Sequence, residues 1–303
     1  MFQIPNIPSA VVVNGDTLYN AMMHGATTYA SRDWRATVRS SQTHPSDGYT
    51  GSYLERRRRQ VATNVPGVRR TIGVLKGRYK ADGGRAAYVV LSGPSLFRNF
   101  KESPPHDDDV VIGVNRGAVE FCGAFQRPVD YLLVADGIVS PAYVNRQWGH
   151  IHARRVVANI CASPDVTHFS DREPFWFRAA GWGHEQIAMG VPMDLPELEY
   201  SFNTGTMALH LADILGCNPI VFVGCDQALT GGEFHPGEKA AESSHNVIAC
   251  PDIHGNWTLA RIDQFIAARK MEAWAFILKQ YGVRVVNLTG AGIVKRFVET
   301  SRS

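Results

Sequence analysis

Short runs of consecutive apolar residues, many of them β-branched, recur along the chain from residue 86 onward. Most of them stop at a glycine or a polar residue. The runs are Ala87–Leu91, Val110–Val114, Tyr131–Ala135, Arg155–Ala158, Pro219–Val223 and Val283–Val286. Continuous apolar runs of this length are typical of strands buried on both faces of a parallel sheet. The pattern therefore predicts a sheet of buried strands.

Helical periodicity appears between these strands. Thr206–Leu215 has apolar residues at helical spacing and ends at Gly216, and Ile262–Tyr281 forms a longer amphipathic segment that ends at Gly282. Glycine after the last periodic residue is a common helix stop. Strands that alternate with helices predict βαβ units. We therefore expect an α/β fold with a doubly wound, mostly parallel, Rossmann-like sheet in a three-layer sandwich.

Two stretches depart from this pattern. Residues 1–80 show little sustained periodicity, and we expect an irregular, basic N-terminal extension that packs loosely on a Rossmann-like domain at 81–303. Within the extension, Ala10–Val13 and Thr71–Leu75 are candidate strands, and Glu55–Ala62 is a candidate helix. Residues 170–200, which are rich in tryptophan and proline, suggest an inserted loop or lid.

The bulk composition is that of an ordinary globular protein and excludes several classes. Hydrophobic residues make up 45% of the 303 residues, charged residues make up 19%, and the net charge of +3 is too small to indicate nucleic-acid binding. Five cysteines without CxxC spacing predict neither a disulfide framework nor a zinc site. No leader pattern and no run approaching ~20 apolar residues is present, so we expect a cytoplasmic protein without a membrane span.

The charge is nevertheless uneven. Arg56, Arg57, Arg58 and Arg59 are consecutive, and further basic residues follow up to Lys80. Such a run is either a solvated surface or an arm that binds a polyanion. The polyanion could be the acceptor substrate.

The clearest chemical motif follows the first strand. Ser92, Gly93, Pro94 and Ser95 form a glycine turn that leads into a helix. Backbone N–H groups at a helix start attract phosphate, and glycine lets the main chain approach a ligand. Pro94 suits the first helical turn, and Ser95 adds a hydroxyl. The alternative is a tight strand–helix turn without a ligand, because the motif is neither a Walker loop nor GxGxxG.

Polar residues also end the next two strands. Asn115 follows the second strand and Asp136 follows the third. The carboxyl ends of parallel strands line the ligand crevice of an open sheet, so these two side chains and Ser95 should share one edge. Each of them alone could be a turn or capping residue. Together they predict contacts to a nucleoside or a sugar. Asp136 is also a candidate catalytic carboxylate.

A second polar cluster precedes a helix. Asn203, Thr204 and Gly205 stand directly before the apolar residues of the helix that ends at Gly216. Helix capping explains one of the polar side chains between 201 and 206. The others suggest a second anion or sugar site at a helix N-terminus.

The fifth strand and its following loop carry the acid–base candidates. Asp226 ends the strand, and His235 stands in a glycine-rich loop after Gly231 and Gly232. Histidine titrates near neutral pH and is a candidate general acid or base, unless it is simply a solvent-exposed loop residue. His245 and His254 lie nearby in the sequence. Their spacing matches no metal motif, so we predict no bound metal.

The order of these elements resembles the MptE-like proteins, formerly domain of unknown function 115. This group includes motility-accessory-factor flagellin glycosyltransferases and 6-hydroxymethylpterin diphosphokinases. The resemblance covers about residues 86–296. It is carried by Ser92–Leu96, Val114-Asn115, Asp130-Tyr131 with Asp136, Asn203–Gly205, Gly224–Asp226, His235, Asp252–Asn256, Glu272 and Val286–Gly292. Asn203–Gly205 and the Asn-x-Thr-x-x-Gly tail are most similar to the accessory-factor branch.

One departure from the resemblance concerns metal. The diphosphokinases of the group carry two close aspartates after the third strand, whereas this chain has only Asp136 there. Pyrophosphoryl transfer on magnesium normally needs carboxylates to hold the ion. Mg²⁺ is therefore expected only under the diphosphokinase alternative.

These observations favour a transferase that uses a nucleotide-activated donor, and a glycosyltransferase with a sugar nucleotide first of all. The alternatives are a diphosphokinase that moves pyrophosphate from ATP to a hydroxymethyl group, and a non-catalytic nucleotide-binding protein. We expect a nucleotide or sugar-nucleotide ligand and no tightly bound cofactor. The sequence is compatible with a homo-oligomer but does not specify the donor base, the sugar or the acceptor.

Overall fold

The fold is that of a computed structural model, which describes residues 53–80, 84–137, 139–142, 144, 150–180, 183–200, 203–239, 247–295 and 297. The candidate strand at Ala10–Val13 and the histidine at 245 lie outside these residues.

The centre of the molecule is an eight-stranded sheet in which every neighbouring pair of strands is parallel. The strands are β1 (Ala87–Val90), β2 (Val110–Val114), β3 (Tyr131–Val134), β4 (Val156–Asn159), β5 (Phe175–Ala179), β6 (Glu197–Leu198), β7 (Ile220–Val223) and β12 (Val285–Asn287), in the order β12-β7-β1-β2-β3-β4-β5-β6. This arrangement confirms the predicted α/β class with a parallel, Rossmann-like sheet.

The apolar runs form strands because both sheet faces are covered. In β1, Ala87 and Val89 belong to one hydrophobic core, whereas Tyr88 and Val90 belong to the core on the opposite face. Successive side chains of a strand point to opposite faces, so a strand covered on both sides must be apolar at every position.

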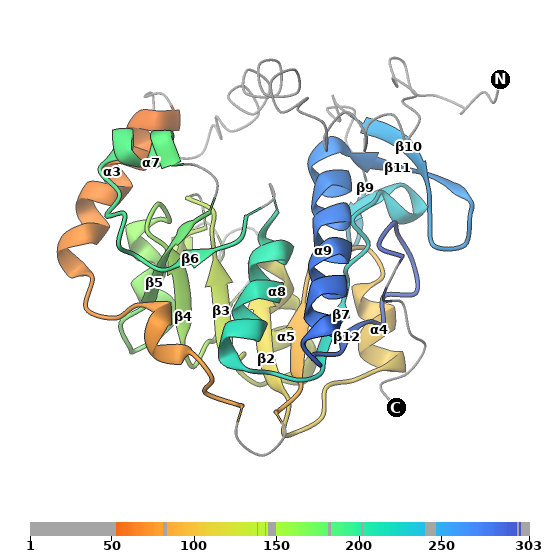
Figure 1. Ribbon diagram of the computed structural model, residues 1–303. Helices are drawn as coiled ribbons and strands as arrows, with labels where there is room; N and C mark the ends of the chain where they lie inside the picture. Colours follow the sequence, from red (N-terminus) through yellow and green to blue (C-terminus); the bar gives the residue numbers. More distant parts are fainter. Residues whose placement is uncertain are drawn as a thin grey trace.

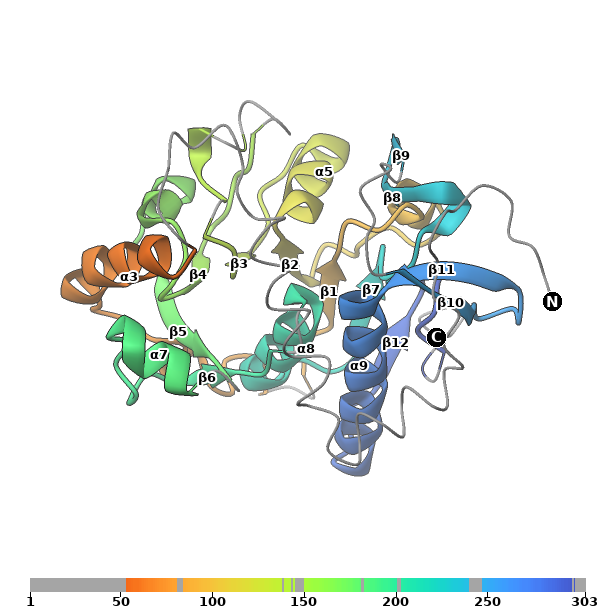
Figure 2. The ribbon, with the colours of Figure 1, turned by 90° about the horizontal axis from the view of Figure 1, so that it is seen from above.

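Helices cover the two faces separately. The helices are α3 (Tyr53–Asn64), α4 (Leu96–Glu102), α5 (Arg116–Phe125), α7 (Gly183–Met189), α8 (Thr204–Leu215) and α9 (Ile262–Gln280). Figure 2 shows the molecule from above, with α5 on one side of the sheet and α8 and α9 on the other. Chain order changes direction between β1 and β7, which makes this pair the topological switch point of the sheet.

Two irregular stretches of the sequence turn out to be ordered parts of the domain. Residues 170–200 contain β5, α7 and β6, and they extend the central sheet where a loop or lid was expected. Thr71–Leu75 was expected to be a strand, but Ile72–Leu75 forms a 3-10 helix, η4, with Ile72 and Leu75 buried. Short apolar runs fit a buried helical turn as well as a strand, so periodicity alone does not separate them.

The described part of the N-terminal extension packs closely on the domain, contrary to the expectation of loose packing. Figure 1 shows α3 beside α7 at one end of the sheet. Val61, Gln60 and Asn64 of α3 are all buried. The Asn64 amide donates hydrogen bonds of 2.9 Å to the Ile160 carbonyl and 3.0 Å to the Ala162 carbonyl. The predicted helix at Glu55–Ala62 lies within α3.

The remaining elements are small. They are the antiparallel pairs β8 (Glu233–His235) with β9 (Glu238–Lys239) and β10 (Val247–Pro251) with β11 (Trp257–Arg261), and the 3-10 turns η3 (Val65–Gly67), η6 (Pro164–Phe169) and η7 (Thr230–Gly232). Among the described residues, no helix combines the length and the hydropathy needed to cross a bilayer.

Candidate functional site

Two loops meet at the switch point, one after β1 and one after β7. The Gly93 N–H donates a 2.8 Å hydrogen bond to the Gly224 carbonyl. The Ser95 hydroxyl donates a 2.7 Å hydrogen bond to Oδ2 of Asp226, and the Ser95 N–H points to the same oxygen at 3.4 Å. Two motifs that lie 131 residues apart in the sequence therefore form one unit.

This unit changes the interpretation of the glycine turn. A Cβ atom on Gly93 would overlap the Asp226 carboxylate and the Gly224 carbonyl. The glycine is therefore required by a close approach to the protein's own β7 loop, and not only by an approach to a ligand. The Asp226 carboxylate also occupies the start of α4, where phosphate was expected to bind.

Asp226 is fully buried, with 0% of its surface exposed. Burial raises the pKa of this carboxyl group, although hydrogen bonds from Ser95 and the hydroxyl of Thr230 act in the opposite direction. Within the described ranges, its buried Oδ1 atom has no hydrogen-bond partner. A neutral carboxyl group is therefore favoured here more than at the protein surface.

This unit is supported by Asn99, which the sequence did not single out, and by Thr289 of the Asn-x-Thr-x-x-Gly tail. Oδ1 of Asn99 accepts a 2.9 Å hydrogen bond from the Gly224 N–H, and the Asn99 amide donates to the Thr289 carbonyl at 3.1 Å. The Thr289 hydroxyl accepts a 2.9 Å hydrogen bond from the Cys225 N–H. Asn99 lies one turn into α4, a position that only the tertiary structure connects with β7.

The predicted acid–base histidine does reach the switch point. Nδ1 of His235 lies 2.7 Å from the Ser92 carbonyl oxygen and 3.1 Å from the Ser92 hydroxyl. Because a carbonyl only accepts hydrogen bonds, this contact places a proton on Nδ1 and leaves Nε2 of the neutral ring as an acceptor. The guanidinium of Arg116, at the start of α5, donates a 3.1 Å hydrogen bond to the Pro236 carbonyl and holds the same loop.

The second polar cluster lies on the other side of the sheet, at the start of α8. The Asn203 side chain accepts a 2.6 Å hydrogen bond from the Gly205 N–H, so it caps the helix. Its amide group donates a 3.0 Å hydrogen bond to the side chain of Gln227, in the β7 loop. Gln227 has a left-handed backbone with a φ of 51°, and no sequence motif pointed to it. Asn203, Gly205 and the β7 loop are thus brought together, while Thr204 opens the helix.

Asn115 ends β2 in a strained conformation. Its φ of 46° and ψ of −120° lie in a region that residues other than glycine rarely adopt. Its side chain does not cap α5, and its buried Oδ1 atom meets no hydrogen-bond partner in the described part of the chain. Gly117, two residues later, packs so closely against the Val90 carbonyl that a Cβ atom would overlap it.

The end of β3, where Asp136 lies, is held by α3. The Arg57 guanidinium donates hydrogen bonds to the Cys161 carbonyl at 2.7 Å and to the Ala135 carbonyl at 3.4 Å. The Gln60 amide donates to the Gly137 carbonyl at 2.7 Å. Asp136 itself is half-buried between these contacts.

The arginine run is therefore not one uniform surface. Arg57 binds the loops after β3 and β4, and Arg58 donates a 3.0 Å hydrogen bond to the Ala188 carbonyl of α7. Arg58 and Arg59 are exposed, whereas Arg56 and Arg57 are half-buried. Part of the run stabilises the docking of α3, and contact with a polyanion stays a prediction.

A group of potential metal ligands lies at the opposite edge of the sheet. His106, Asp108 and Asp109 place ligand atoms within 4.8 Å of one another just before β2 begins. This is the amino edge of the sheet, away from Ser95, Asp226 and His235. The group offers no metal to the chemistry of the carboxyl edge.

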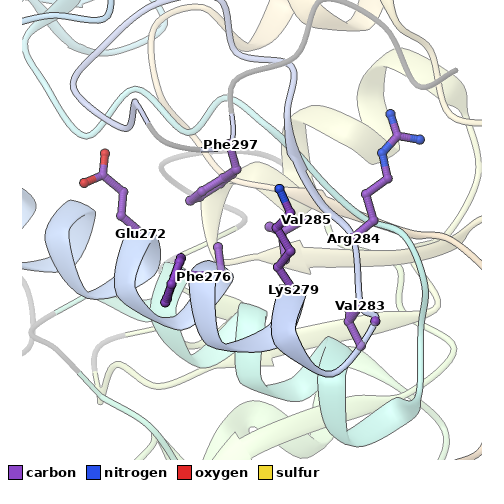
Figure 3. A pocket seen from close by; sticks show the side chains of 9 residues that line it. Glu272, Phe276, Lys279, Val283, Arg284, Val285 and Phe297 are labelled. Carbon is purple, nitrogen blue, oxygen red and sulfur yellow. The ribbon is translucent and has the colours of Figure 1, made fainter.

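A cavity of about 540 Å³ also lies away from the carboxyl edge. Figure 3 shows the side chains around it, with Phe297 facing the α9 residues Glu272 and Lys279. It is lined by Glu272, Ala275, Phe276, Lys279, Gly282, Val283, Arg284, Val285 and Phe297. The Glu272 carboxylate is neutralised by Arg269 at 2.7 Å. The lining contains none of the predicted site residues.

The fold and the carboxyl edge thus define a doubly wound α/β protein with polar loops gathered at its switch point. No protein-family model matches the chain, and no curated protein does. Among solved structures, the MAf glycosyltransferase from Magnetospirillum magneticum AMB-1 has a similar fold, with a TM-score of 0.56 and 15% sequence identity. The similarity covers 84% of this chain and 39% of that protein, so this chain spans well under half of its length.

Proposed function

We propose that the protein is a glycosyltransferase that uses a nucleotide-activated sugar and binds it at the carboxyl edge of β1, β2, β3 and β7. The observation that carries the proposal is the convergence of His235 with Ser92 at the switch point, where ligands bind in open α/β sheets. The similarity in fold to a glycosyltransferase supports the same class.

The occupied start of α4 shifts the proposed donor site. Asp226 already accepts the hydrogen bonds of Ser95, so a phosphate group would compete with a buried carboxyl group there. The start of α8, with Asn203, Thr204 and Gly205, is the better place for the donor phosphates, because a helix start favours anions. Asn115 and Asp136 would then contact the nucleoside or the sugar.

His235 is the proposed acid–base residue. With its proton on Nδ1, the ring can accept a proton from an acceptor hydroxyl at Nε2. Ser92 orients the ring through its carbonyl group. Because Asp226 is fully buried, we propose that it holds Ser95 and does not itself exchange a proton with a substrate.

A thermal-shift screen of nucleotides and sugar nucleotides tests the proposal. A ligand at about 100 times its Kd stabilises the folded state by ~2.7 kcal/mol, which corresponds to roughly 5–10 °C for a domain of this size. Any nucleotide sugar that shifts the transition should then be consumed in an assay that detects the released nucleotide. Binding without consumption would favour a non-catalytic nucleotide-binding protein, and the absence of any shift would contradict the proposal.

A further inference from the structure

A buried side-chain oxygen on α3 indicates a substrate contact made by the N-terminal extension, which precedes the domain predicted at 81–303. Gln60 is 8% exposed, and its amide nitrogen is fixed by the 2.7 Å hydrogen bond to the Gly137 carbonyl. That bond also fixes the opposite orientation of its Oε1 atom. This oxygen is buried and has no hydrogen-bond partner among the residues that the structure describes.

A buried acceptor without a partner is costly, by roughly 1–3 kcal/mol, and native proteins contain few of them. Oε1 lies beside Gly137, since a Cβ atom built on that glycine would come within 2.6 Å of it. Gly137 follows Asp136 directly, at the end of β3. The unpaired oxygen therefore lies at the ligand edge of the sheet.

A second unpaired acceptor lies on the neighbouring strand. Oδ1 of Asn115, at the end of β2, is also buried without a partner, and the Asn115 backbone is strained. Strained residues cluster at ligand sites, where binding compensates for their cost. Two neighbouring strand ends thus each hold an acceptor without a donor.

We infer that Gln60 is a specificity-determining residue that accepts a hydrogen bond from a sugar hydroxyl of the donor. The two phosphates of a nucleotide sugar are fully ionised at neutral pH and have no proton to donate, whereas every sugar hydroxyl has one. The hydroxyl belongs either to the ribose of the nucleotide or to the transferred sugar. Oε1 is covered by the Gly137 turn, so the turn shifts when the hydroxyl binds. This inference rests on the proposed function.

The test measures the affinity of the protein for paired ligands. One arm compares uridine, cytidine and guanosine diphosphates with their 2′-deoxy and 3′-deoxy forms. The other compares the corresponding nucleotide sugars with analogues that lack one sugar hydroxyl. Loss of one hydrogen-bonded hydroxyl should weaken binding to the parent protein by about 10-fold. The arm in which this loss appears identifies the ribose or the transferred sugar as the source.

The decisive variant is Gln60→Met, which keeps the size of the side chain but removes Oε1. It should bind the hydroxyl and deoxy forms within about twofold of each other, because the acceptor is gone. Gln186→Met is the matched control. Gln186 is equally buried, donates to the Ala179 carbonyl at the end of β5 and has an unpaired Oε1, but it lies two strands away from β3. It should keep the 10-fold preference of the parent.

A Gln60→Met protein that keeps the parental preference overturns the inference but leaves the proposed function intact. A parent that binds no nucleotide or nucleotide sugar overturns both. If Gln60→Met does not fold, Gln60→Asn decides the question, because it keeps an uncharged amide but withdraws the carbonyl oxygen by one methylene group. The penalty for the deoxy ligand should then fall below that of the parent, and an unchanged penalty overturns the inference.

Discussion

Gly93→Ala should destabilise the fold, although a ligand-binding glycine in an open loop would tolerate the change. The added methyl group has no space, because its position overlaps the carboxylate of Asp226 and the carbonyl of Gly224. Neither group can move freely, since Ser95 and the Gly93 N–H hold them by hydrogen bonds.

The magnitude follows from two contributions. Overpacking a well-packed site by one methyl group costs ~1–3 kcal/mol. Displacing Asp226 breaks its buried 2.7 Å hydrogen bond with Ser95, which adds ~1–3 kcal/mol. The free energy of unfolding should therefore fall by roughly 2–6 kcal/mol, which lowers the Tm by at least about 4 °C.

Thermal unfolding followed by circular dichroism measures this effect, and Gly123→Ala is the matched control. Gly123 lies in α5, and a Cβ atom there meets nothing within 4 Å. Its replacement should raise stability by ~0.4–1 kcal/mol, because alanine restricts the unfolded chain. A Gly93→Ala protein with the parental Tm but reduced nucleotide binding would refute the packing argument and restore the ligand as the reason for this glycine.

The other predictions concern catalysis, metal and pH. His235→Ala should lower turnover by at least about 100-fold with little change in donor affinity, whereas His254→Ala, on an exposed turn, should not; the reverse result would move the acid–base role. EDTA should leave turnover nearly unchanged, because the ligand group His106, Asp108 and Asp109 lies at the amino edge; complete loss that magnesium restores would favour the diphosphokinase. Burial raises the pKa of Asp226 in the folded state. The stability that its protonated carboxyl group contributes is therefore fully present below the unfolded-state pKa of about 3.9, and it is lost as the pH rises through the folded-state pKa. The free energy of unfolding of Asp226→Asn, measured in urea, should therefore increase relative to that of the parent as the pH rises from about 4 to 8. A difference between the two proteins that is independent of pH would contradict the raised pKa.

Apolar patterning was sufficient for the framework of this protein. The six runs from Ala87 to Val286 correspond to β1, β2, β3, β4, β7 and β12, and the stop at Gly216 marks the end of α8. These features are local, because two-sided burial requires apolar residues at every position of a strand. The same logic placed Asn115, Asp136 and Asp226 at strand ends, and hence at one edge of the sheet.

Periodicity failed where residues are buried by contacts that are distant in sequence. β5 and β6 are short, and prolines and tryptophans surround them, so only pairing with β4 identifies them as strands. α3 appeared to be a polar, basic extension. Its Gln60 and Asn64 are buried and its Arg57 is half-buried, and all three donate to main-chain carbonyls of the loops after β3 and β4. Carbonyl groups leave no trace in a sequence pattern.

Local sequence patterns are enough to place residues at the carboxyl edge, because strand direction and strand ends are encoded locally. The contacts that those residues make with one another depend on the tertiary structure. The Ser95 hydroxyl meets the Asp226 carboxylate and not an open phosphate site, and His235 folds back onto Ser92. Contacts between residues 131 and 143 positions apart depend on how the β1 and β7 loops are brought together, which no local propensity specifies.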